Sequence, residues 1–253
     1  MLERGLSHTT VLHTHRVIKE MLAHAVKWGV IAKNPADGAT PPKRAKKQMP
    51  MWDVPTIHRF LDESQGTRYG HIFEFGISTG LRRSEIAGLK WDAVDLVGAR
   101  LEVKATLQQI LGHGLVTGTP KTERSRRNIA LAPETVALLQ VVQGTQQLAK
   151  LEAGPVWKEK GYVFTQADGS PVLPGTLTEN FRFLVRELAM PQLTFHGLRH
   201  AFATLGLLAG INPKVVQEAL GHSSVSITMD TYSHVLPHMQ GELAAAIANI
   251  LKR

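Results

Sequence analysis

The chain has 253 residues, 43% hydrophobic and 20% charged, as expected of a soluble globular protein with one large domain or two modest ones. It has no cysteine, which excludes disulfides and thiolate metal sites and fits a reducing cytoplasm. No apolar run could span a membrane, the polar start argues against a signal peptide, and the net charge of +8 indicates a polyanionic partner.

Much of the positive charge lies near the start, where residues 1–50 hold nine Lys or Arg against three acidic residues. Ser7 is expected to cap a helix that ends at Gly29, and a short piece continues to Asn34-Pro35. One long helix with a short continuation cannot enclose a core by itself. We therefore expect residues 1–38 either to be part of a larger helical domain or to pack elsewhere.

Residues 39–50 contain three prolines and a cluster of basic residues, which predicts an extended linker. Its basic residues are Lys43, Arg44, Lys46 and Lys47. The segment is either a solvated tether or a strap that lies along the phosphates of a nucleic acid. We expect the compact remainder, residues 51–253, to form a second domain.

After the linker, Asp53 is expected to cap a helix through Leu61, and a second helix spans roughly residues 69–79. Gly80 should end that helix, and Ser84 should cap the next one. Residues 99–131 alternate apolar and polar side chains between turn signals, which predicts three antiparallel strands.

Helices return in the second half of the chain. The expected ranges are Pro133–Leu151, Leu177–Leu188, Leu198–Ala209, Pro213–Leu220 and Val225–Thr231. In the fourth of these, Asn212 is the expected N-cap, Gly221 ends the helix, and Val215, Val216 and Leu220 form the apolar face. The fold class is mainly α with a small three-stranded antiparallel sheet (α+β). A last apolar stripe within residues 241–253 packs either on its own domain or on a neighbouring protomer.

Arg82 and Arg199 are the candidates for binding a phosphate, because a guanidinium stays charged and matches two phosphate oxygens. Arg83 serves as a natural control, expected to be a solvated surface arginine. Glu85, three residues after Arg82, is interpreted as a buried carboxylate that orients Arg or His side chains. A surface carboxylate is the alternative.

Tyr232 is either a core tyrosine or a nucleophile. With an ordinary phenol pKa near 10, only about one tyrosine side chain in a thousand is ionised at neutral pH. Forming the phenolate there costs a free energy of roughly 4 kcal/mol. Nearby Arg and His side chains would recover much of this by stabilising the phenolate. Lys121 is a candidate proton donor to a leaving alkoxide, or simply one member of a basic run.

A metal site is a weaker interpretation of the histidines. His196 and His200 are four residues apart, which on a helix places them on one face, and His222 would be a third ligand. However, Gly197 stands where a zinc protease needs its glutamate base, and the fixed charge of Arg199 would repel a dication. An anion site fits these residues better.

Taken together, five motifs in order resemble those of the tyrosine recombinase (phage integrase) family, over about residues 50–240. They are Thr79–Glu85 (T-G-L-R-R-S-E), Pro120–Arg127 (P-K-T-E-R-S-R-R), His196–His200 (H-G-L-R-H), Leu220–Ser224 (L-G-H-S-S) and Thr231–His234 (T-Y-S-H). The stretch from Gly5 to Pro35 also resembles the last part of that family's core-binding domain. The resemblance thus implies a catalytic domain at 51–253, preceded by a partial helical core-binding domain at 1–38.

The resemblance also implies roles for individual residues. Arg82 and Arg199 would hold the non-bridging oxygens of the scissile phosphate, and His222 would add a hydrogen bond there. His196 would accept a proton or orient the phosphate, and Lys121 would protonate the departing 5′ oxygen. Tyr232 would form a 3′-phosphotyrosyl link, with Glu85 as structural support. Because a tyrosyl phosphodiester roughly conserves bond energy, neither ATP nor a metal is expected.

The family implies a mobile-element integrase that acts in a prokaryotic cytoplasm as a homotetramer on double-stranded DNA, assembled through residues 241–253. A related type IB topoisomerase, which uses a similar set of residues, is one alternative. The others are a non-catalytic DNA-binding protein on the same scaffold and a metal-dependent hydrolase.

Overall fold

The computed structural model describes residues 5–42, 50–119 and 126–221. The chain separates into two compact units, Met1–Met49 and Pro50–Arg253. In the described part of the first unit, α1 (His8–Lys27) is capped by Ser7, whose side chain accepts a hydrogen bond from the Thr10 N–H. A 3-10 turn, η2 (Pro35–Gly38), follows. No residue of α1 is buried within this unit, as expected of a single long helix.

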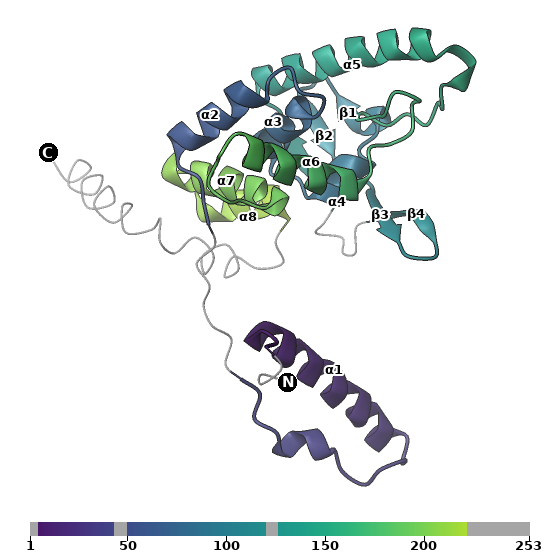
Figure 1. The fold of residues 1–253 in the computed structure, drawn as a ribbon, viewed down its shortest axis with the longest axis vertical. Coiled ribbons are helices and arrows are strands. Elements are labelled where there is room, and N and C mark those ends of the chain that lie inside the picture. Colours follow the sequence, from purple (N-terminus) through teal and green to yellow (C-terminus); the bar gives the residue numbers. More distant parts are fainter. Residues whose placement is uncertain (1–4, 43–49, 120–125, 222–253) are drawn as a thin grey trace, which may run out of the picture. The chain divides into compact units, whose positions relative to one another are not determined.

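The second unit is built mainly of helices around one hydrophobic core (Figure 1). Its helices are α2 (Val54–Ser64), α3 (Gly70–Thr79), α4 (Arg83–Gly88), α5 (Pro133–Ala153), α6 (Pro174–Glu187), α7 (Phe195–Leu208) and α8 (Pro213–Leu220). Short 3-10 turns occur at η3 (Trp91–Ala93) and η5 (Gly154–Val156). Each of the helices predicted within the described residues is therefore present.

Helix α3 lies at the centre of this core and packs against α2, α5 and α7. Its sequence is apolar on nearly all sides, which is typical of a helix buried all round. Phe73 stacks edge-to-face on Phe181 of α6 and Phe195 of α7, with ring centroids 5.4 and 6.1 Å apart. These aromatic contacts fix the start of α7, which carries two of the predicted site residues.

The strands confirm the fold class but not the predicted pairing. One antiparallel sheet has the order β1 (Val94–Asp95), β2 (Arg100–Glu102), β5 (Asn128–Ala130). A separate hairpin pairs β3 (Thr106–Ile110) with β4 (Gly114–Gly118). Residues 99–131, predicted to form one three-stranded sheet, thus divide between two sheets.

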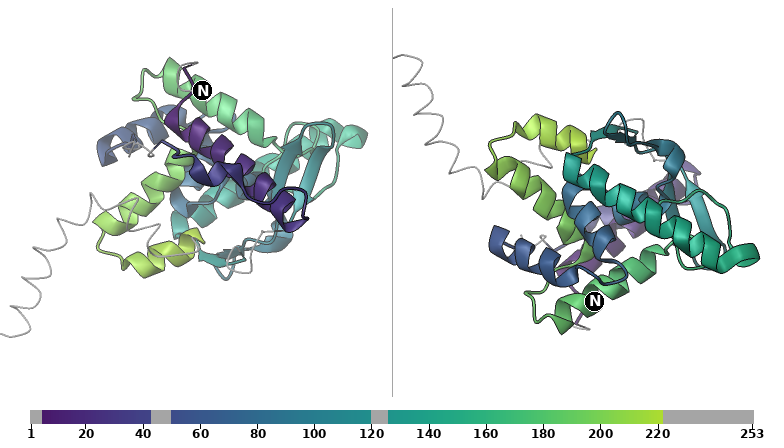
Figure 2. Two further views of the ribbon diagram at one scale, coloured as in Figure 1. Left: turned by 90° about the horizontal axis from the view of Figure 1, so that it is seen from below. Right: turned by 90° about the horizontal axis from the view of Figure 1, so that it is seen from above.

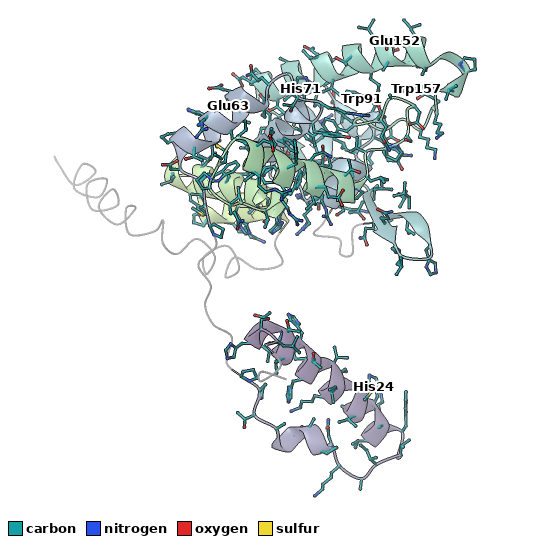
Figure 3. The ribbon with its side chains drawn as sticks, viewed as in Figure 1. His24, Glu63, His71, Trp91, Glu152 and Trp157 are labelled. Carbon is teal, nitrogen blue, oxygen red and sulfur yellow. The ribbon has the colours of Figure 1, made fainter. Side chains whose placement is uncertain are left out.

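Helix α5 is held against the sheet side of the unit by a polar contact. The indole of Trp91, labelled in Figure 3, donates a hydrogen bond to Gln146 Oε1 at 2.8 Å. The amide of Gln146 in turn donates to the Tyr162 carbonyl at 2.9 Å. This partly buried amide, hydrogen-bonded on both sides, adds to the apolar packing of Leu138 and Leu139 in holding the helix.

Helices α7 and α8 lie side by side in both views of Figure 2. Val216 and Leu220 of α8 are buried against Ala203 and Leu207 of α7 in a small apolar cluster of their own. The prediction that Val215 belongs to the same apolar face is wrong. Val215 is 54% exposed, because its side chain lies about 100° around the helix from that of Val216. This packing sets where α8 ends.

Candidate active site

Arg82 is placed by the junction between α3 and α4. Gly80 ends α3 in the left-handed conformation, with φ 62°, so the chain reverses before α4 begins. Arg82 itself is the N-cap of α4, which corrects the prediction that Ser84 would cap it; Ser84 lies inside the helix. Instead of a short polar side chain, the Glu85 carboxylate satisfies the Arg82 backbone N–H at 2.8 Å.

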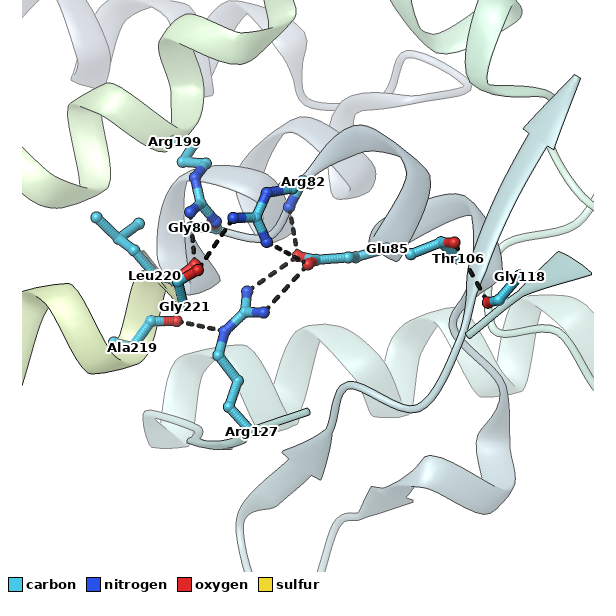
Figure 4. Close-up of polar contacts among 10 residues, drawn as sticks. All are labelled: Gly80, Arg82, Glu85, Thr106, Gly118, Arg127, Arg199, Ala219, Leu220 and Gly221. Carbon is cyan, nitrogen blue, oxygen red and sulfur yellow. Dashed lines mark hydrogen bonds and ion pairs between the residues drawn. The ribbon is translucent and has the colours of Figure 1, made fainter. Parts of the chain in front are cut away.

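The carboxylate of Glu85 is buried, with the residue 3% exposed, and accepts hydrogen bonds from two guanidiniums (Figure 4). Arg82 Nη1 donates to Oε1 at 2.8 Å. Arg127 binds both oxygens, at 3.1 and 2.9 Å. Burial raises the pKa of Glu85, but the hydrogen bonds and charges of Arg127 and Arg82 outweigh it and lower the pKa below its ordinary range. The carboxyl is therefore ionised at neutral pH.

Arg199 is presented by the second turn of α7 and is only 3% exposed. Its Nη1 donates to the Gly80 carbonyl at 2.8 Å, and its Nη2 donates to the Leu220 carbonyl at 2.5 Å. The residue therefore ties the end of α3 to the end of α8. Burying a guanidinium is costly unless it is hydrogen-bonded, and these two carbonyls offset part of that cost.

The structure brings Arg82 and Arg199 together at the end of α8. Arg82 Nη2 donates to the Gly221 carbonyl at 3.1 Å, next to the Leu220 carbonyl that Arg199 binds (Figure 4). Arg83, the predicted control, is exposed and donates to Thr178 Oγ1 on α6. Adjacent arginines in the sequence thus face different environments.

His196 lies on the first turn of α7, with its ring edge-on to that of His200 at a centroid distance of 4.7 Å. Loss of water around the imidazole, followed by the positive charges of Arg199 and Arg82, lowers the pKa of His196. The side chain nevertheless keeps a solvent-exposed edge. It is therefore a neutral imidazole at neutral pH that a bound molecule can reach.

Several predicted site residues lie outside the described residues. They are Lys121, His222, Tyr232, the linker residues Lys43, Arg44, Lys46 and Lys47, the helix predicted at 225–231, and the segment 241–253. Within the described residues, no cluster of three or more His, Asp or Glu side chains has the geometry of a metal site. No helix among them has the length and apolarity to cross a bilayer.

Arg127 was not singled out from the sequence, although a signal was present. Ile129 and Leu131 are buried while Asn128 and Ala130 are exposed, so alternate side chains of β5 point inward. Arg127 has the same parity as Ile129 and also points inward, where its Nε donates to the Ala219 carbonyl at 2.6 Å. The alternation of inward and outward side chains along the strand, extended back to Arg126 and Arg127, would have identified Arg127 as the inward-facing arginine.

The chain is similar to known proteins over most of its length. Residues 47–239 match the phage integrase family. The chain belongs to the phage integrase family. Its relatives include a XerC-like tyrosine recombinase of Caldanaerobacter subterraneus subsp. tengcongensis, 29% identical over 94% of this chain and 65% of the relative. The ICEBs1 integrase of Bacillus subtilis is 24% identical over 99% of this chain and 68% of its own length.

Among solved structures, the integrase of transposon Tn1549 in complex with transposon right end DNA is similar, with a TM-score of 0.81 and 26% identity. It covers 96% of this chain, which in turn covers 82% of that structure. A λ integrase dimer bound to a core site shares the fold, with a TM-score of 0.58 and 15% identity. The chain spans about two thirds of the length of the first of the curated relatives.

Proposed function

We propose that this member of the phage integrase family is a tyrosine-type site-specific DNA recombinase. It cleaves and rejoins double-stranded DNA through a 3′-phosphotyrosyl intermediate, without a metal ion or ATP. The family match and the DNA-bound Tn1549 integrase support the substrate class. The position of the two arginines supports the chemistry.

The convergence of Arg82 and Arg199 carries the proposal. Their guanidiniums meet at the Leu220 and Gly221 carbonyls, where α8 ends, directly before His222 in the chain. Arg82 and Arg127 both pair with Glu85, and Arg199 binds the neighbouring carbonyl at the end of α8. Positive charge fixed in a partly buried site favours a phosphodiester and the extra negative charge of its transition state.

In the proposed reaction, the phenol oxygen of Tyr232 attacks the scissile phosphorus and the bond from phosphorus to the 5′ oxygen breaks. His196 takes the phenol proton or orients the phosphate, and its lowered pKa keeps it neutral for that purpose. Lys121 gives a proton to the departing 5′ oxygen. One phosphodiester replaces another, so reversal by a different 5′ hydroxyl completes strand exchange.

Partners follow from the same proposal. The basic linker residues Lys43, Arg44, Lys46 and Lys47 lie along DNA phosphates, where each contact would make binding more salt-dependent. Four protomers assemble on two duplexes through residues 241–253, in a prokaryotic cytoplasm. Relatives named as the ICEBs1 integrase and the transposase of transposon Tn916 support a mobile-element origin.

A covalent-trapping assay tests the function. The protein is incubated with nicked suicide duplexes taken from the DNA that flanks its gene, in EDTA and without ATP, and separated under denaturing conditions. We expect a protein–DNA adduct that depends on the DNA sequence. Loss of activity in EDTA would favour a metal-dependent hydrolase, and relaxation of any supercoiled plasmid would favour a topoisomerase. Tight DNA binding without an adduct would favour a non-catalytic protein.

A further inference from the structure

Arg127 links three parts of the second unit through one side chain. Its backbone carbonyl accepts a hydrogen bond from the Val103 N–H at 2.9 Å, which anchors it beside β2. Its guanidinium binds Glu85 at the start of α4 and the Ala219 carbonyl at the end of α8. The side chain is 7% exposed, too little for direct contact with a DNA backbone.

The first consequence concerns Arg82. A carboxylate offers about four acceptor positions, and Glu85 uses four. Two receive the Arg82 backbone and guanidinium, and two receive Arg127. Arg127 therefore limits how Glu85 holds Arg82. Without it, Glu85 would have two unfilled positions and would draw Arg82 further from the end of α8.

The second consequence concerns α8. The last carbonyls of a helix have no partner within the helix and carry its negative dipole end. Here three consecutive carbonyls are each bound by a different arginine: Ala219 by Arg127, Leu220 by Arg199 and Gly221 by Arg82 (Figure 4). Arg127 thus fixes the helix end from which the chain continues to His222.

We propose, on the basis of the proposed recombinase function, that Arg127 is a positioning residue for strand cleavage. It sets Arg82 through Glu85 and sets the end of α8 through Ala219. It also joins both to the strand that follows the Lys121 segment in the chain. Arg127 acts on the transition state through these groups and contributes little to DNA affinity.

The test uses Arg127→Lys, which keeps the positive charge but lacks the planar fork that binds two carboxylate oxygens and a carbonyl together. The adjacent Arg126→Lys is the matched control, because Arg126 is exposed. Thermal melting first establishes that each variant is folded at the assay temperature. The same suicide duplex then gives two values, the equilibrium DNA affinity and the single-turnover rate of adduct formation at saturating protein.

We expect Arg127→Lys to form the adduct about 10- to 100-fold more slowly at saturation, because small misplacements of a reacting group are that costly. Its DNA affinity, and both values for Arg126→Lys, should stay within about twofold of the parent. In a Glu85→Gln background, Arg127→Lys should reduce the rate by a smaller factor than in the parent, because the part of its effect that passes through Glu85 is already lost.

The outcomes separate this inference from the proposed function. An unchanged saturated rate in Arg127→Lys would overturn the inference alone. So would an equal loss in Arg126→Lys, or a loss of DNA affinity as large as the loss of rate. If neither Arg127→Lys nor Arg127→Gln folds, the residue is required for the fold and the positioning role is refuted. A parent protein that forms no adduct would contradict the proposed function, and the inference with it.

Discussion

Three arginines from distant parts of the chain meet at one short run of carbonyls, Ala219, Leu220 and Gly221. Two of them, Arg82 and Arg199, were predicted from the sequence as phosphate-binding candidates, and each lies in a motif that resembles the tyrosine recombinase family. The contacts themselves join residues about 20 to 140 positions apart, and no local pattern specifies such a pairing. Two of the three arginines were therefore identified as candidates from the sequence, whereas the third residue and all of these hydrogen bonds needed the fold.

The titration of His196 gives a prediction at the level of single residues. Partial desolvation and two nearby guanidiniums disfavour the imidazolium form, so the pKa lies below the ordinary value of about 6.5. As pH falls from neutral, His196 should stay neutral after ordinary histidines have gained a proton. NMR titration measures this, with the resonance of His196 assigned from its loss in His196→Gln.

Substitution of one arginine tests the electrostatic part of this explanation. Arg82→Gln removes a positive charge near the ring and should raise the midpoint of His196, whereas Arg83→Gln should leave it in place. Arg83 is the adjacent residue but is exposed and bound to Thr178 on α6. A midpoint at or above the ordinary value in the parent protein would contradict the account.

Among the secondary-structure elements, the helices were predictable because residues at their own ends mark where they begin and end. Asp53, Asn212 and Ser7 each cap a helix as expected, with a side-chain oxygen that accepts a backbone N–H. The strands were harder to predict, since β2 ends after three residues and three residues outside any strand separate it from β3. That break depends on packing, because Gly88 of α4 lies against the backbone of Thr106 and Leu107.

The junction after α3 provides a test at this scale. Gly80 has φ 62°, and a Cβ there would lie 2.5 Å from the ring of Phe202 on α7. Gly80→Ala should lower the free energy of unfolding by about 1–2 kcal/mol because of the left-handed backbone. The contact with the ring should lower it further. Because the Gly80 carbonyl accepts from Arg199, the substitution should also slow adduct formation. Urea unfolding measures the stability.

Gly210→Ala is the matched control for this substitution. Gly210 has φ 75°, but a Cβ there would meet nothing within 4 Å. In Gly210→Ala, the free energy of unfolding should therefore fall only by the amount due to the left-handed backbone. Equal losses of stability in the two variants would mean that the contact between α3 and α7 does not constrain the junction.

At the level of the whole molecule, membership of the phage integrase family was readable from five motifs in order, and residues 47–239 confirm it. Motif spacing survives in sequences that share only about a quarter of their residues, such as the Tn1549 integrase at 26% identity. The division into two units follows Met49, within the basic, proline-rich segment. Assembly is not readable in this way, because it depends on surfaces of several protomers.

Assembly gives its own prediction. The apolar stripe of Leu243, Ile247, Ile250 and Leu251 has helical spacing, and we propose that it docks on a neighbouring protomer. Deletion of residues 241–253 should reduce tetramer formation on DNA, measured by sedimentation, while a single protomer still binds one site. Unchanged assembly would mean that the stripe packs on its own domain.

In the proposed function, the phenol of Tyr232 becomes esterified to a DNA strand end. Mass spectrometry of the trapped adduct after nuclease and protease digestion identifies the residue that carries the nucleotide. We expect a nucleotide on the peptide that contains Tyr232, and no adduct from Tyr232→Phe, although Tyr69→Phe still reacts. A nucleotide on any other residue, or an adduct that persists in Tyr232→Phe, would contradict it.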